Sequence, residues 1–132
     1  MHEIYGWVVL SESTRDIDEG GLERKVQNIR EQCNKAEWEL WAPGKIEVIL
    51  NNGIYKLTVH AISDREGYES KDFHAILNTV VAELPGSWGV IYETIQQDHD
   101  GYSAGSYKVF VVRRGQIEVH QDPFLSPRHK FI

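Results

Sequence analysis

The chain has a single cysteine, Cys33, among its 132 residues, so it cannot form an intramolecular disulfide bond. A lone thiol is consistent with a reducing compartment. No apolar run approaches the ~20 residues that a membrane-spanning helix needs. The first residues lack the basic region and apolar stretch of a secretory signal. The sequence therefore predicts a cytoplasmic protein without a membrane partner.

Basic residues are also few, since 14 Lys and Arg face 20 Asp and Glu and leave a net charge of −6. This balance disfavours nucleic acid as a direct partner, because a binder must neutralise phosphates with Lys and Arg. It suits a basic protein partner, because opposite charges accelerate encounter. An acidic surface that only maintains solubility has the same composition, so both interpretations stay open at this point.

Motifs for catalysis and for metal or cofactor binding are missing. None of the six histidines forms an i, i+4 pair or a His-Glu-x-x-His pattern. The stretch 98–101 is similar to part of a calcium loop, but Tyr107 falls where the bidentate glutamate belongs. His60 and His120 lie on the polar sides of predicted strands, which is typical of surface histidines. We expect no metal and no cofactor.

Glu93 is the carboxylate for which a catalytic role stays open. A cross-strand ion pair with Lys108 or Arg113 is the simpler interpretation. The alternative is a small hydrolase-like enzyme that uses Glu93 and a histidine for acid–base chemistry. That alternative predicts a pocket in which Glu93 lies within hydrogen-bond reach of His60 or His120.

Hydrophobic periodicity predicts eight elements in the order β-α-β-β-α-β-β-β. Apolar residues recur at helical spacing in two stretches, and two short polar stretches, Asn51-Asn52-Gly53 and Arg114-Gly115, are typical of tight hairpins. The predicted helices cover about 22–37 and 70–84, and the predicted strands about 4–10, 45–51, 54–63, 87–96, 106–113 and 116–120.

This order favours the α+β class and a single domain over residues 1–132. We expect one antiparallel-rich sheet of about six strands, with both helices packed on one face. The first six elements also permit a ferredoxin-like core that the last hairpin extends. Beyond that hairpin, Pro123 and Pro127 bracket Phe124 and Leu125 and force an extended path. We expect this tail to cross the domain, with Phe124 and Leu125 as its anchors.

Recognition is the function that the surface composition favours. Acidic residues gather in the connecting segments before the first helix, before the second helix, and after the strand that contains Glu93. Aromatic residues lie in or beside such connections, at Trp38, Trp41, Tyr68 and Tyr102. Trp38 and Trp41 can equally roof the core. The residues that we expect to contact a partner are Asp16, Asp18, Glu19, Glu66, Glu69, Asp72, Asp98, Asp100 and Tyr102.

Three segments together indicate a family. They are Tyr5-Gly6-Trp7, residues 86–93 with the sequence GSWGVIYE, and residues 122–127 with the sequence DPFLSP. On these segments the chain resembles immunity protein 7, a family of bacterial polymorphic toxin and contact-dependent growth inhibition systems. The resemblance implies a small α+β protein that binds the toxin domain of a neighbouring gene and neutralises it inside the producing cell.

The resemblance and the charge together predict a stoichiometric inhibitor that is not an enzyme. Its partner would be a basic toxin domain, which we expect to be a nuclease because nucleases carry positive charge to hold phosphates. A homo-oligomer is compatible with the sequence. A scaffold or oligomer subunit without catalysis is the remaining alternative to the hydrolase described above.

Overall fold

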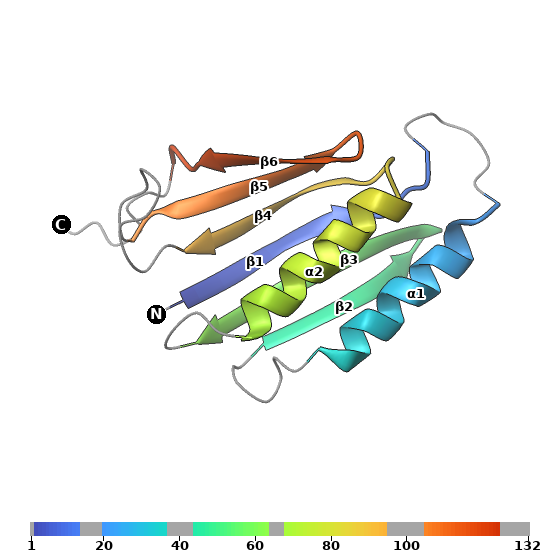
Figure 1. The fold of residues 1–132 in the computed structure, drawn as a ribbon, viewed down its shortest axis with the longest axis horizontal. Helices are drawn as coiled ribbons and strands as arrows, with labels where there is room; N and C mark the ends of the chain where they lie inside the picture. Colours follow the sequence, from blue (N-terminus) through green and yellow to red (C-terminus); the bar gives the residue numbers. More distant parts are fainter. Residues whose placement is uncertain (1, 14–19, 37–43, 64–67, 95–104, 125–132) are drawn as a thin grey trace.

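Six strands form one antiparallel sheet, and two helices pack on one of its faces (Figure 1). The computed structural model describes residues 2–13, 20–36, 44–63, 68–94 and 105–124. The predicted class and element order are confirmed. The helices are α1 (Leu22–Lys35) and α2 (Tyr68–Glu83), and the strands are β1 (His2–Val9), β2 (Gly44–Asn51), β3 (Ile54–Ser63), β4 (Trp88–Thr94), β5 (Tyr107–Arg113) and β6 (Gln116–Gln121).

The strand order is β2-β3-β1-β4-β5-β6. Its first four strands have the order of the ferredoxin-like split β-α-β arrangement, and the β5–β6 hairpin extends the sheet beside β4. Both predicted hairpin turns are present. Asn52 and Gly53 have φ of 54° and 76°, and Arg114 and Gly115 have φ of 53° and 71°. Two successive left-handed residues match the twist of the strands that they connect.

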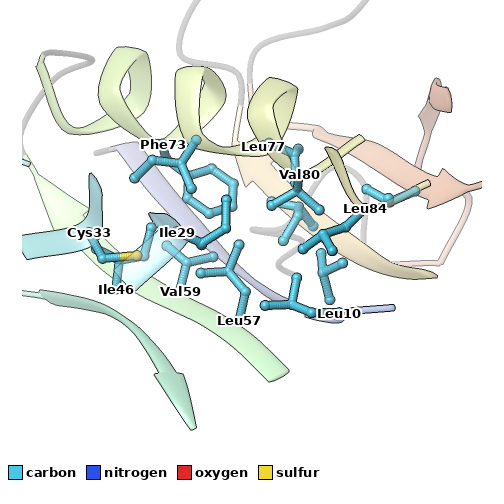
Figure 2. Close-up of a cluster of buried hydrophobic side chains, with 14 of the residues drawn as sticks. Leu10, Ile29, Cys33, Ile46, Leu57, Val59, Phe73, Leu77, Val80 and Leu84 are labelled. Atoms are coloured by element: carbon cyan, nitrogen blue, oxygen red, sulfur yellow. The ribbon is translucent and has the colours of Figure 1, made fainter. Parts of the chain in front are cut away.

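The core lies between the helices and the sheet face that they cover, which we call the helix-covered face (Figure 2). Each strand alternates its side chains between the two faces, so every second residue points to this core. Burial of each large apolar side chain contributes roughly 1.5–3 kcal/mol. The fully buried residues include Ile4 and Val8 of β1, Leu57 of β3, Ile91 of β4, Val26 and Ile29 of α1, and Phe73, Leu77 and Val80 of α2.

Cys33 extends the apolar stripe of α1 and is 8% exposed. The prediction of a small core residue is therefore confirmed. Burial raises the pKa of its thiol from 9.0 to about 11. A thiol that stays protonated at neutral pH is a poor nucleophile.

Two glycines allow β1 and β4 to lie close together. A Cβ atom at Gly89 would stand 2.1 Å from the Trp7 carbonyl oxygen, and one at Gly6 would stand 2.2 Å from the Val90 carbonyl oxygen. No side chain fits at such distances from backbone atoms, so both positions require glycine. The close contact sets the residues of β1 against those of β4 in a fixed register.

The segment after β6 differs from the expectation. Phe124 is 85% exposed, so its predicted role as an anchor is wrong. Asp122 holds this segment instead, since it is 2% exposed and its backbone N–H donates to the Tyr107 carbonyl oxygen at 3.1 Å. Pro123 then ends the strand pairing because it has no N–H to donate. Leu125 lies outside the described residues.

Candidate functional site

The sheet face opposite the helices, here called the outer face, carries five clustered aromatic side chains. Their positions follow from the strand register, in which Tyr5 pairs with Tyr92 and Trp7 with Val90, while Val9 pairs with Trp88. On β5, Tyr107 pairs with Thr94 and points to the same face. We call Tyr5, Trp7, Trp88, Tyr92 and Tyr107 the aromatic cluster.

The rings of the aromatic cluster contact one another in defined geometries. Tyr5 stacks on Tyr92 with ring centroids 5.3 Å apart and planes 12° apart, and Tyr107 meets both rings edge-on at 6.0 and 5.9 Å. Trp7 and Trp88 form an edge-to-face pair at 5.5 Å. Such pairs contribute roughly 0.5–1.5 kcal/mol beyond area burial. The cluster is therefore rigid on a sheet rather than carried by loops.

Exposure varies across the aromatic cluster. Tyr107 is buried, Tyr5, Trp7 and Tyr92 are partly exposed, and Trp88 is 53% exposed. Charged and polar residues border the cluster on the strands at and near the two edges of the sheet. An aromatic centre with a charged rim is the anatomy of a protein-binding surface. The rim consists of Lys45, Glu47, Lys56, His60, Arg113, Glu118 and His120.

One end of the outer face is acidic. The Glu3 carboxylate accepts a hydrogen bond from the Tyr107 hydroxyl at 3.3 Å and lies 3.4 Å from Nε2 of His60. Burial raises the pKa of the Tyr5 phenol, and Tyr107, Glu3, Tyr92 and Asp122 raise it further. Nearby carboxylates make it harder to form another anion there, so the same place favours a cation.

Glu93 lies on the helix-covered face, where it joins two histidines. Nε2 of His2 donates to Oε2 of Glu93 at 2.6 Å, and Nε2 of His74 donates to Oε1 at 2.7 Å. His2 is 1% exposed and Glu93 is 7% exposed. The carboxylate thus connects α2 to β1 and β4, and we call these three residues the Glu93 clamp.

Among the predicted partners of Glu93, Lys108 lies directly opposite it in the β4–β5 register, on the same face of the sheet, whereas Arg113 pairs with Glu118 and the two predicted histidines are wrong. His60 and His120 lie on the outer face, on the other side of the sheet, so neither can reach Glu93. Both are exposed, as predicted, with side chains that are 65% and 57% exposed. Arg113 pairs with Glu118 at 2.8 Å, and this contact, followed by that of His120, holds the pKa of Glu118 below its usual value.

Most of the predicted contact residues lie outside the described residues. Asp72 is described, half-buried on α2, and the backbone of Glu69 belongs to the same helix. The calcium-loop stretch, Trp38 and Trp41 also lie outside the described residues. The predicted contacts that lie outside them are Asp16, Asp18, Glu19, Glu66, Asp98, Asp100 and Tyr102.

Two of the segments outside the described residues adjoin the sheet near Glu3. Segments 64–67 and 95–104 join the sheet at Ser63, Thr94 and Gly105. These are at the end of the sheet where Glu3 lies, since Glu3 pairs with Ile62 and its N–H donates to the Thr94 hydroxyl at 2.7 Å.

Sequence reasoning missed the aromatic cluster. The first strand is apolar on both faces, a pattern that favours burial throughout, but Tyr5 and Trp7 differ from Ile4 and Val8 in being aromatic and are partly exposed. The same alternation places Trp88 and Tyr92 on one face of β4. Aromatic residues at i and i+2 or i and i+4 of neighbouring strands are the signal that could have predicted the cluster.

Other features bear less on function. Within the described ranges, no group of three or more His, Cys, Asp and Glu residues is arranged to hold a metal ion. In the same ranges, neither helix has the length and apolar character needed to cross a membrane. A shallow depression along α1 has a lining of mixed charge that includes Glu23, Arg24 and Glu31.

Comparisons with known proteins give one match. A family model described as Immunity protein 7 matches residues 1–132. No curated protein and no solved structure matches the chain. Two of the three segments that carry the resemblance contain Tyr5-Gly6-Trp7 and Trp88 to Tyr92, so they form the β1–β4 pair that displays the aromatic cluster.

Proposed function

The chain belongs to the immunity protein 7 family, and we propose that it neutralises a cognate toxin domain by binding it in a stoichiometric complex. The observation that carries the proposal is the family match over residues 1–132 in a chain of net charge −6. An acidic inhibitor associates fastest with a basic target. The complex forms in the cytoplasm of the cell that makes both proteins.

A basic nuclease is the toxin that this charge fits best. Nucleases hold phosphates with Lys and Arg. Carboxylates of the inhibitor can take the positions of phosphate oxygens and accept charge-assisted hydrogen bonds from those side chains. In this proposal the contacts come from Asp16, Asp18, Glu19, Glu66, Glu69, Asp72, Asp98, Asp100 and Tyr102.

The arrangement of Glu93 supports a protein that acts by binding and catalyses no reaction. A general base must reach the proton that it removes, directly or through one water. Both oxygens of Glu93 already accept hydrogen bonds from His2 and His74, and the carboxylate is 7% exposed. The clamp therefore has a role in holding α2 on the sheet.

Binding to the toxin domain encoded by the neighbouring gene tests the proposal. Isothermal titration at ~50 and ~500 mM NaCl should give a 1:1 complex whose affinity falls at least tenfold at the higher salt, because screening shortens the reach of surface charge. Circular dichroism at both salt concentrations controls for unfolding. Absence of a complex would overturn the immunity function, and an affinity that does not change with salt would overturn the acidic attraction alone.

A further inference from the structure

We propose that the toxin docks on the outer face of the sheet and places an arginine or lysine side chain against the aromatic cluster, beside Glu3. The proposal rests on the proposed function and adds the surface and the chemistry of the contact. It places the centre of the contact on the strands themselves, in place of Glu69 and Asp72, since α2 covers the opposite face of the sheet.

The aromatic cluster has the composition and the stiffness of a binding hot spot. Tyrosine and tryptophan are enriched at hot spots, where a large ring gives much contact area for little loss of conformational entropy. The stacking of Tyr5 on Tyr92 and the contact of Trp7 with Trp88 hold these rings before any partner arrives. The 53% exposure of Trp88 leaves a large apolar surface available to a partner.

The charge at the Glu3 end of the aromatic cluster favours a cation, while the rest of the rim has both signs of charge. Nζ of Lys56 lies 5.3 Å from the centroid of the Trp7 ring, so this ring already has an ammonium group of the chain itself beside it, and a cation of the toxin is expected at the tyrosine rings instead. At the other end, Glu3 is beside Tyr5 and Tyr107, and Asp122 adds negative charge close by. A guanidinium or ammonium group of the toxin can stack on a tyrosine ring there and pair with a carboxylate.

A second copy of this chain is the competing occupant. The rim of the outer face already contains internal ion pairs, with Lys45 at 3.9 Å from Glu47 and Arg113 at 2.8 Å from Glu118. The cation and the carboxylate of each pair are therefore partly neutralised already, so these pairs offer little charge attraction to a second copy. Each copy also carries a net charge of −6, which opposes self-association. A basic toxin is attracted by that net charge and finds the carboxylate of Glu3 beside the tyrosine rings.

Two variants and two matched controls test the docking surface. Trp88→Ala removes the most exposed ring of the aromatic cluster, and Glu3→Gln removes the carboxylate with little change of shape. Leu50→Ala is the control for Trp88, because Leu50 is also 53% exposed but lies on the other face, at the edge hairpin. Glu31→Gln on α1 is the control for Glu3. Circular dichroism and the urea midpoint identify any variant that is not folded.

Affinity for the toxin domain of the neighbouring gene is the measurement. We expect Trp88→Ala to raise Kd about 30-fold or more, the size of a hot-spot loss. Glu3→Gln should raise Kd about tenfold at ~50 mM NaCl and less at ~500 mM NaCl. Both controls should stay within about twofold of the unchanged chain.

The outcomes separate this inference from the proposed function. If the unchanged chain does not bind the toxin, the proposed function fails and the docking surface fails with it. If it binds, and folded Trp88→Ala and Glu3→Gln bind equally well, the docking surface is wrong while the immunity function stands. Sedimentation that shows a dimer lost in Trp88→Ala, with toxin binding unchanged, would assign the outer face to a second copy and overturn the inference.

Discussion

Replacement of Glu93 by glutamine should destabilise the fold without weakening toxin binding. The change keeps the shape of the side chain and removes its charge. In the folded chain both carboxylate oxygens accept short hydrogen bonds, from His2 at 2.6 Å and from His74 at 2.7 Å. A glutamine has only one acceptor oxygen, so its NH₂ group must face one of the two histidines.

His2 cannot easily adapt to that NH₂ group. Its Nδ1 is buried and has no hydrogen-bond partner within the described part of the chain, so moving the proton to Nδ1 would leave a buried donor unpaired. The side chain of His74 is 31% exposed, so its proton can move to the other ring nitrogen, where water can accept a hydrogen bond from it. We therefore expect the amide oxygen to face His2 and the amide nitrogen to face His74.

The expected loss of stability follows from the hydrogen bonds that Glu93 accepts from His2 and His74. A hydrogen bond to a charged group contributes about 1.5–3 kcal/mol and a neutral one about 1 kcal/mol, so Glu93→Gln should lower the free energy of unfolding by about 2 kcal/mol. For a chain of this length the corresponding shift in Tm is about 7 °C. Glu93→Leu should cost more, about 3–5 kcal/mol, because it leaves buried histidine donors unpaired.

Urea denaturation at pH 7 measures these losses, with Glu47→Gln on the outer face as the control, expected within about 0.5 kcal/mol of the unchanged chain. The Kd of Glu93→Gln for the toxin should stay within about twofold, because Glu93 lies on the helix-covered face. If Glu93→Gln is as stable as the control, the clamp is unimportant for the fold. If it is stable but abolishes toxin neutralisation, a functional role for Glu93 replaces the structural one.

Three further predictions concern single positions. Folding raises the pKa of the Cys33 thiol from 9.0 to about 11, so the stability that the protonated thiol contributes is complete below pH 9 and declines up to pH 11. The difference in free energy of unfolding between the unchanged chain and Cys33→Ala, measured by urea titration, should therefore shrink by up to about 3 kcal/mol over that range. Gly89→Ala should cost about 2–4 kcal/mol because its Cβ meets the Trp7 backbone, whereas Gly20→Ala, with open space around it, should change stability by less than about 1 kcal/mol. Arg113→Gln should move the pKa of Glu118 back toward its ordinary value in an NMR titration. A lowered carboxyl pKa stabilises the fold above the unfolded pKa, so the difference in stability between Arg113→Gln and the unchanged chain should disappear as the solution is acidified. A Cys33→Ala stability difference that does not change with pH would contradict the burial of the thiol. A Gly89→Ala chain as stable as the unchanged one would contradict the close approach to the Trp7 backbone, and a Glu118 pKa that does not move would contradict its pairing with Arg113.

The elements were predictable because their signals are local. Helical spacing of apolar residues predicted α1 and α2, and the turn residues Asn52-Gly53 and Arg114-Gly115 predicted both hairpins. Because both predicted helices have an apolar stripe to bury, the prediction that they cover one face of the sheet followed from them.

The cross-strand neighbour Lys108 was predictable, but the histidine partners of Glu93 were not, because they depend on which face of β4 meets which face of β1. Register decides that relation, and a shift of one residue would move Glu93 to the other side of the sheet. His2 and His74 are 91 and 19 residues from Glu93 in the chain, so no spacing rule connects them. Alternation within each strand predicts that Tyr5 lies on one face with Trp7 and Trp88 with Tyr92, but the pairing of β1 with β4 that joins them into one cluster again depends on register.

Titration of the toxin's own activity with this chain tests the account most directly. The activity of the toxin domain encoded by the neighbouring gene is measured at a concentration far above Kd while the chain is added in increasing amounts. A stoichiometric inhibitor predicts a linear fall that reaches zero at one equivalent. Full loss of activity at a small fraction of an equivalent would mean that the chain inactivates the toxin catalytically, and no loss at several equivalents would mean that it is not the toxin's inhibitor.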